Sequence, residues 1–93
     1  MGSVERVFRV QFTKEAEADL EGLDPTIRRR VIERLRWLAD NAESVRHEAL
    51  TGSLGGLFRL RTGNYRTLYD LAPGEEIILV HAVGHRRDIY RRR

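Results

Sequence analysis

The sequence has no cysteine and only a single lysine, Lys14, among its seventeen basic residues. Without cysteine there is neither a disulfide framework nor a cysteine-ligated zinc site. No apolar run approaches the roughly 18 residues that a membrane-spanning helix needs, and no signal-peptide hydrophobic region follows the start. We therefore expect a cytoplasmic protein with no membrane partner. A chain of 93 residues predicts a single domain spanning 1–93.

Arginine supplies all the other basic residues, and its distribution relative to the acids is uneven. Residues 1–56 carry nine basic side chains against ten acidic ones, whereas residues 57–93 carry eight arginines against four acids. A guanidinium group is planar, permanently charged and able to bind phosphate through two hydrogen bonds. A GC-rich genome would raise the arginine content everywhere, but it does not explain the asymmetry. The C-terminal half therefore indicates an anionic partner.

Residues 7–41 predict a strand followed by two helices. Val7–Phe12 is short and rich in Val and Phe, as strands are. Thr13 is a suitable N-cap for a first helix, and Asp24-Pro25 provides a capping side chain and an N-terminal proline for a second. The second helix should reach about Asn41, because apolar residues recur along it at helical spacing. Joined by a short connection, the two form a helical hairpin.

The stretch Leu57–Leu71 alternates apolar and polar residues on both sides of Gly63-Asn64, which is the pattern of a β-hairpin. Successive side chains of a strand point to opposite faces, so the hairpin concentrates its basic groups in a small area. The guanidinium groups concerned are those of Arg59, Arg61 and Arg66. We predict that they hold RNA phosphate. Alternatively, Arg66 is a partly buried structural arginine paired with Asp70.

The remaining segments complete an α+β domain. Residues 43–56 are expected to form a loop, in which His47 receives no role. Residues 76–83 are apolar on both faces and predict a central strand, with His81 as a hydrogen-bonded core histidine. The residues after Gly84 read as a basic tail too polar for a core strand. The predicted order is β-α-α-β-β-β, with the two-helix hairpin packed on a small, mostly antiparallel sheet. No histidine pairing indicates a metal site, and no cofactor is expected.

Three stretches carry a resemblance to a known family: Leu50–Gly52, Phe58–Tyr69 and Val83–Tyr90. They resemble the RelE/ParE toxin superfamily of type II toxin–antitoxin systems, and the RelE-like branch in particular, over nearly the whole chain. The resemblance implies a ribosome-dependent mRNA endonuclease, or mRNA interferase, that inhibits translation. It implies as partners the ribosome, mRNA and a cognate antitoxin, through which the complex binds operator DNA.

The chemistry that the resemblance implies is metal-free attack of the ribose 2′-hydroxyl on phosphorus, which leaves a 2′,3′-cyclic phosphate. By motif position, Arg66 matches the family's phosphate-stabilising arginine and Arg86 a second catalytic arginine. Tyr90 matches a C-terminal tyrosine that stacks on a base or orients the phosphate. Arg59 stands where well-studied RelE proteins have a lysine.

The proton acceptor is the open part of this assignment. A second lysine of those proteins falls at Leu57, and arginine is a poor base because its pKa exceeds about 12. His85 is the best local candidate, since unperturbed histidine titrates near 6.5. Chemistry assisted by the substrate on the ribosome is the alternative. Arg61 and Arg87 are expected to bind RNA.

Two other functions fit the same resemblance. The first is a ParE-like toxin that poisons DNA gyrase without any RNA chemistry. The second is a degenerate toxin that retains only antitoxin or operator binding. Both would use the same fold, so a distinction between them requires the target to be identified.

Overall fold

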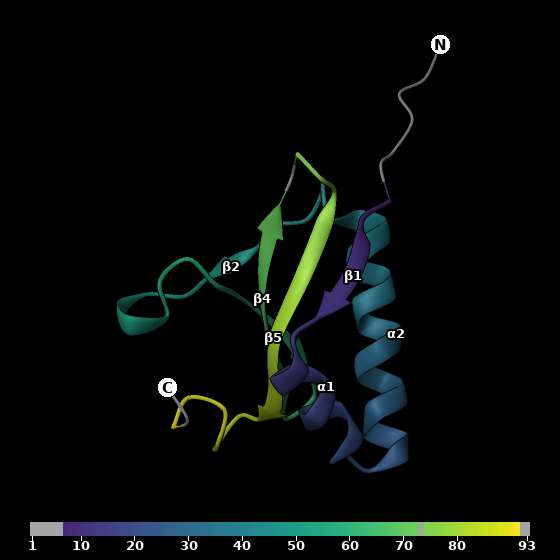
Figure 1. The fold of residues 1–93 in the computed structure, drawn as a ribbon, viewed down its shortest axis with the longest axis vertical. Coiled ribbons are helices and arrows are strands. Elements are labelled where there is room, and N and C mark those ends of the chain that lie inside the picture. Colours follow the sequence, from purple (N-terminus) through teal and green to yellow (C-terminus); the bar gives the residue numbers. More distant parts are fainter. Residues whose placement is uncertain (1–6, 73, 92–93) are drawn as a thin grey trace.

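The computed structural model describes residues 7–72 and 74–91, which form two helices on one face of a five-stranded sheet (Figure 1). The elements in chain order are β1 (Arg9–Phe12), α1 (Lys14–Glu21), α2 (Pro25–Asn41), β2 (Glu48–Ala49), the 3-10 turn η1 (Gly52–Leu54), β3 (Phe58–Thr62), β4 (Tyr65–Ala72) and β5 (Ile77–His85). The strand order is β1-β5-β4-β3-β2, parallel between β1 and β5 and antiparallel elsewhere. The predicted α+β class and mostly antiparallel sheet are confirmed.

Capping side chains set the beginnings of both helices, as predicted. The Thr13 side chain accepts a hydrogen bond from the Ala16 N–H at 3.2 Å, and Asp24 accepts one from the Thr26 N–H at 2.9 Å. These bonds satisfy amide groups that have no partner within the helix. Arg28 then ties the helices together, because its guanidinium donates to carbonyls at the end of α1, including that of Leu20 at 3.0 Å. No described helix is both long and apolar enough to cross a bilayer.

The main core lies between the helices and the sheet. Residues Val31, Leu35 and Leu38 of α2 are buried against it, which confirms the predicted helical stripe. The sheet contributes Leu60 and Tyr69, together with alternating residues of β5. This packing holds β3 and β4 firmly on their helix-facing side.

A second, smaller cluster covers part of the opposite face of the sheet. Its buried members are Leu68, Ala82 and Ile89, and the half-buried residues packed on them come from residues 50–57 and from Tyr90. As expected, the polar segment after Gly84 adds no core strand over the described residues 86–91, but β5 continues to His85 and Ile89 is fully buried. The burial of Ile89 against Leu68 and Ala82 is enough to hold this mostly polar segment on the sheet. Residues 92–93 of that tail lie outside the described residues.

The predicted loop over residues 43–56 contains β2 and η1, and two histidines differ from expectation. His47 is not without a role, because its ring nitrogens contact the Tyr69 hydroxyl at 2.6 Å and the Ala42 carbonyl at 2.8 Å. His81 occupies a β-bulge, where the register of β4 and β5 shifts. Its buried Nε2 has no hydrogen-bond partner in the described chain, so the prediction of a hydrogen-bonded core histidine was wrong.

Candidate functional site

The β3–β4 hairpin positions the three arginines that the sequence indicated. A two-residue turn closes it, and Gly63 adopts a φ of +59° there, which glycine tolerates without steric cost. The register pairs Arg61 with Arg66 and Arg59 with Leu68. Residues directly opposite on neighbouring strands share a face, so all three arginines belong to the face that points away from the helices.

Arg59 is held from two sides. One of its guanidinium nitrogens, Nη1, donates to the Tyr90 hydroxyl at 2.9 Å, and Nη2 donates to the carboxylate of Glu48. Its side chain is 24% exposed, so the group is partly enclosed but still reachable from solvent. The structure thus brings together two predicted site residues, Arg59 and Tyr90, that lie 31 positions apart. The burial of the neighbouring Ile89 holds Tyr90 in this place.

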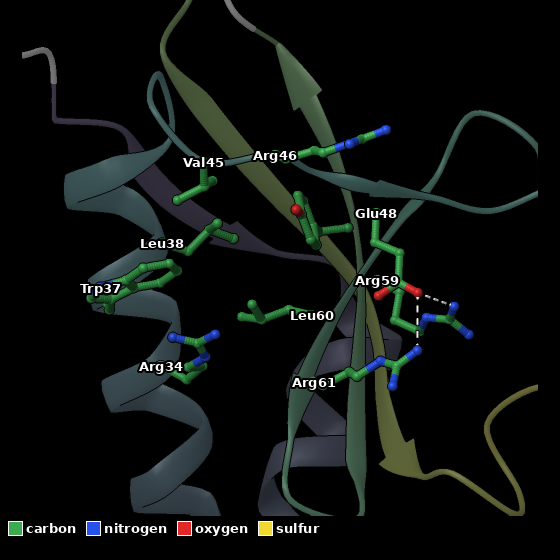
Figure 2. Close-up of a pocket in the computed structure, with 10 residues that line it drawn as sticks. Arg34, Trp37, Leu38, Val45, Arg46, Glu48, Arg59, Leu60 and Arg61 are labelled. Carbon is green, nitrogen blue, oxygen red and sulfur yellow. Dashed lines mark hydrogen bonds and ion pairs between the residues drawn. The ribbon is translucent and has the colours of Figure 1, made fainter.

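Glu48 joins Arg59 to Arg61. The Arg61 Nη2 donates to Glu48 Oε2 at 3.1 Å, and this is the same oxygen that accepts from Arg59 (Figure 2). Hydrogen bonds from Arg59 and then Arg61 lower the pKa of Glu48 to about 2, and the bond to Glu48 raises the pKa of Arg59. The sequence did not indicate Glu48, because a strand of two residues has no periodicity to detect.

Arg66 has different surroundings from the other two arginines. It is buried, and its Nη1 donates to the carbonyls of Gly63 at 2.8 Å and Tyr65 at 2.9 Å. Arg66 therefore fastens the hairpin turn from within. Its suggested pairing with Asp70 does not form, since the Asp70 carboxylate accepts from the backbone of Leu71 at 2.8 Å instead.

The C-terminal candidates lie near the same turn but on different sides of it. The Arg86 N–H donates to the Asn64 carbonyl at 2.8 Å, which places Arg86 beside the hairpin turn with its side chain exposed. Arg87 is exposed as well. His85 pairs with Tyr65, and their rings meet edge-on with centroids 5.3 Å apart.

The register also separates His85 from the arginine cluster. Tyr65 precedes Arg66 in β4, so its side chain points to the opposite face, and His85 lies on that face with Tyr65. The His85 Nδ1 accepts from the Arg87 N–H at 3.2 Å. The structure therefore does not bring His85 together with Arg59, although the sequence placed both in one site.

A pocket of about 190 Å³ opens between α2 and β3, next to the arginine pair (Figure 2). Four arginines line it against a single acid, and they are Arg34, Arg46, Arg59 and Arg61, with Glu48 as the acid. On α2, the Arg34 guanidinium stacks over the half-exposed ring of Trp37, 4.1 Å from its centroid. On the helix side the pocket thus offers a guanidinium stacked on an aromatic ring, whereas the guanidinium groups of Arg59 and Arg61 lie at the outer face of the sheet with Glu48. Within residues 7–72 and 74–91, no three side chains form a metal-binding group.

Residues 10–90 match a protein-family model described as "ParE toxin of type II toxin-antitoxin system, parDE". The chain is 36% identical over 86 residues to Toxin RelG of Mycobacterium tuberculosis (strain ATCC 25618 / H37Rv). This alignment covers 91% of the chain and 98% of RelG.

Solved structures give the same picture of the fold. The toxin–antitoxin complex RelBE2 of Mycobacterium tuberculosis aligns with a TM-score of 0.75 and 32% identity, over 84% of this chain and 96% of that one. The archaeal RelE–RelB complex of Pyrococcus horikoshii OT3 aligns with a TM-score of 0.68 and 26% identity, over 86% and 96%. The isolated E. coli RelE toxin, at 20% identity and a TM-score of 0.68 over 84% and 83%, shares the fold.

Proposed function

Because this chain belongs to the RelE/ParE superfamily, the toxins of type II toxin–antitoxin systems, we propose that it is a ribosome-dependent mRNA endonuclease that inhibits translation. The observation that carries the proposal is the convergence of Arg59 and Arg61 on one anionic oxygen, with the Tyr90 hydroxyl 2.9 Å from Arg59. An RNA phosphate presents an anionic oxygen of the same kind.

The proposed reaction begins with attack of the ribose 2′-hydroxyl on the adjacent phosphorus. The bond from phosphorus to the 5′-oxygen breaks, the 5′-oxygen takes up a proton from water and leaves as a hydroxyl, and a 2′,3′-cyclic phosphate remains. The pentacoordinate phosphorane carries more negative charge than the starting diester, so fixed cationic donors stabilise it selectively. Arg59 and Arg61 supply such donors, and Arg86 is placed to supply another from beside the hairpin turn. The buried Arg66 supports the reaction by fastening that turn.

The 2′ proton requires an acceptor, and His85 lies on the other face of the sheet from the arginine pair. Glu48 is a weak base, because its two arginine partners lower its pKa to about 2. An acceptor from the ribosome or from the RNA itself therefore fits the geometry better than either residue. Orientation of the 2′-hydroxyl by the ribosome would lower the activation free energy of cleavage by several kcal/mol, and this would account for the proposed dependence on translation.

The proposed regulation is by a cognate antitoxin in the cytoplasm. Similar structures include the RelBE2 toxin–antitoxin complex and the RelE–RelB complex, so a bound antitoxin accords with this fold. An acidic extended or helical segment of that antitoxin would complement the four arginines of the pocket. Operator DNA would be contacted through the antitoxin.

The decisive experiment is primer extension on mRNA from cells in which this protein is induced without an antitoxin. We expect stops within translated codons, and we expect purified protein to cut mRNA on translating ribosomes but not naked RNA. The matched control is Arg59→Ala, produced at the same soluble level. Intact mRNA in cells that hold verified soluble wild-type protein would contradict the proposal.

The second candidate function is ParE-like poisoning of DNA gyrase. It is favoured by the family model that matches residues 10–90, whose description names the ParE toxin. Under this alternative the arginine cluster would bind a protein or DNA surface without chemistry. Double-strand DNA breaks alongside intact mRNA in the same induced cells would select it.

A further inference from the structure

The carboxylate of Glu48 lies where donors from two arginines converge. Both Arg59 and Arg61 direct an Nη2 donor to its single oxygen Oε2, so the two guanidinium groups already converge on one anion. The site is open, since the side chains of Arg61 and Glu48 are 59% and 39% exposed. A ligand can therefore reach the oxygen-binding position from solvent.

We propose that Glu48 is an internal competitor of the RNA phosphate, whose carboxylate occupies the anion-binding position of Arg59 and Arg61 until the phosphate displaces it. The identity of the anion rests on the proposed function, whereas the competition itself rests on the geometry alone. Glu48 is then a positioning residue, which acts through the two arginines.

The local structure allows such an exchange. Glu48 lies in β2, which pairs with β3 through only two residues, Glu48 with Arg59 and Ala49 with Phe58. Its side chain can turn outward without loss of a strand or of a core contact. Arg59 would remain in place when the carboxylate leaves, because the Tyr90 hydroxyl still accepts from its Nη1 at 2.9 Å. The Arg59 half of the binding geometry therefore survives the departure of Glu48.

The carboxylate also has a reason to be present in the free protein. The guanidinium groups of Arg59 and Arg61 contact the same oxygen, so they lie close enough to repel each other, and an anion between them offsets the repulsion. Because a free phosphate must first displace Glu48, random RNA and inorganic phosphate bind weakly. An mRNA phosphate that the ribosome presents at high local concentration competes effectively.

The test measures binding by the free protein, without ribosomes. An uncleavable 2′-O-methyl RNA trinucleotide and, separately, inorganic phosphate are titrated at low salt into wild type and into Glu48→Gln. Glutamine keeps the shape of the side chain but removes its charge. We expect roughly 5- to 10-fold tighter binding to the variant, which corresponds to about 1–1.4 kcal/mol and lies within the net contribution of a typical hydrogen bond. The matched control is Glu75→Gln, which removes an exposed charge from the β4–β5 turn and should change affinity less than twofold.

A second measurement keeps the inference testable if Glu48→Gln folds poorly. In wild type, NMR signals of the Glu48 carboxyl carbon and the Arg59 guanidinium should shift together and with one dissociation constant as phosphate is added. Unchanged or weaker binding by folded Glu48→Gln would overturn the competition. So would an Arg59 shift without a Glu48 shift. Tighter binding together with intact mRNA in cells would instead retain the competition and reject the ribonuclease.

Discussion

Replacement of Ile89 by alanine tests whether the C-terminal segment is part of the folded domain. Ile89 has 0% exposure and packs in the cluster with Leu68 and Ala82, although the segment around it in the sequence is rich in charged residues. Truncation of a fully buried isoleucine costs about 2–5 kcal/mol, through lost burial and the cavity that remains. A domain of this size has a total stability of roughly 5–14 kcal/mol. The substitution therefore removes a large fraction of the total free energy of unfolding.

The measurement is thermal unfolding followed by circular dichroism. In a domain of 60–100 residues, each kcal/mol corresponds to about 4–8 °C, so Ile89→Ala should lower the Tm by at least about 8 °C. Ile89→Val removes a single methylene and should cost only about 0.5–1.5 kcal/mol. Val7→Ala is the control at an exposed apolar site and should leave the Tm nearly unchanged.

The result bears on the site as well as on stability. Ile89 anchors Tyr90, and the Tyr90 hydroxyl accepts the hydrogen bond that holds Arg59. If the segment frays independently of the core, the global Tm stays constant, because local opening does not enter the global unfolding free energy. A shift below about 2 °C in Ile89→Ala, with Ile89→Val equal to wild type, would refute the packing of this segment.

Three further outcomes are expected. Arg59→Ala should slow single-turnover mRNA cleavage on ribosomes by about 100- to 1000-fold without unfolding the protein. Arg66→Ala should slow cleavage too, and it should lower the free energy of unfolding by roughly 1–3 kcal/mol because two turn carbonyls lose their donor. Burial, with a smaller contribution from Glu48, raises the pKa of Tyr69 to about 12. Its stabilising contribution is complete below about pH 10 and is lost as the pH rises through 12, so Tyr69→Phe should flatten the alkaline part of a Tm-against-pH curve. The pKa of Glu48 is instead lowered from 4.5 to about 2. Its contribution to the free energy of unfolding is therefore complete above pH 4.5 and is lost as the pH falls through 2, and Glu48→Gln should not show this loss of stability in acid.

The helices, the hairpin and the fold class followed from local sequence patterns. Thr13 and Asp24 mark helix starts because a capping side chain needs only the next few backbone amides. The apolar stripe of α2 and the alternation around Gly63-Asn64 likewise repeat within a few residues. The alternation placed Arg59 and Arg61 on one face of the first strand, and the pairing register then put Arg66 on the same face of the sheet.

The partners of the site arginines were decided by contacts between segments that are distant in the sequence. Glu48 meets Arg59 across 11 positions, and Tyr90 meets it across 31. Neither contact has a local signature, because β2 is too short for a periodic pattern and Tyr90 lies in a segment dominated by charge.

The three arginines illustrate the division. Their sequence context and charge are nearly the same, yet Arg59 and Arg61 share a carboxylate at an open pocket while Arg66 is buried against two turn carbonyls. Alternation in a strand determines the face on which a side chain lies, and this is encoded locally. Its hydrogen-bond partners are whatever other segments the packed core brings to that face, and this is set only when the chain folds.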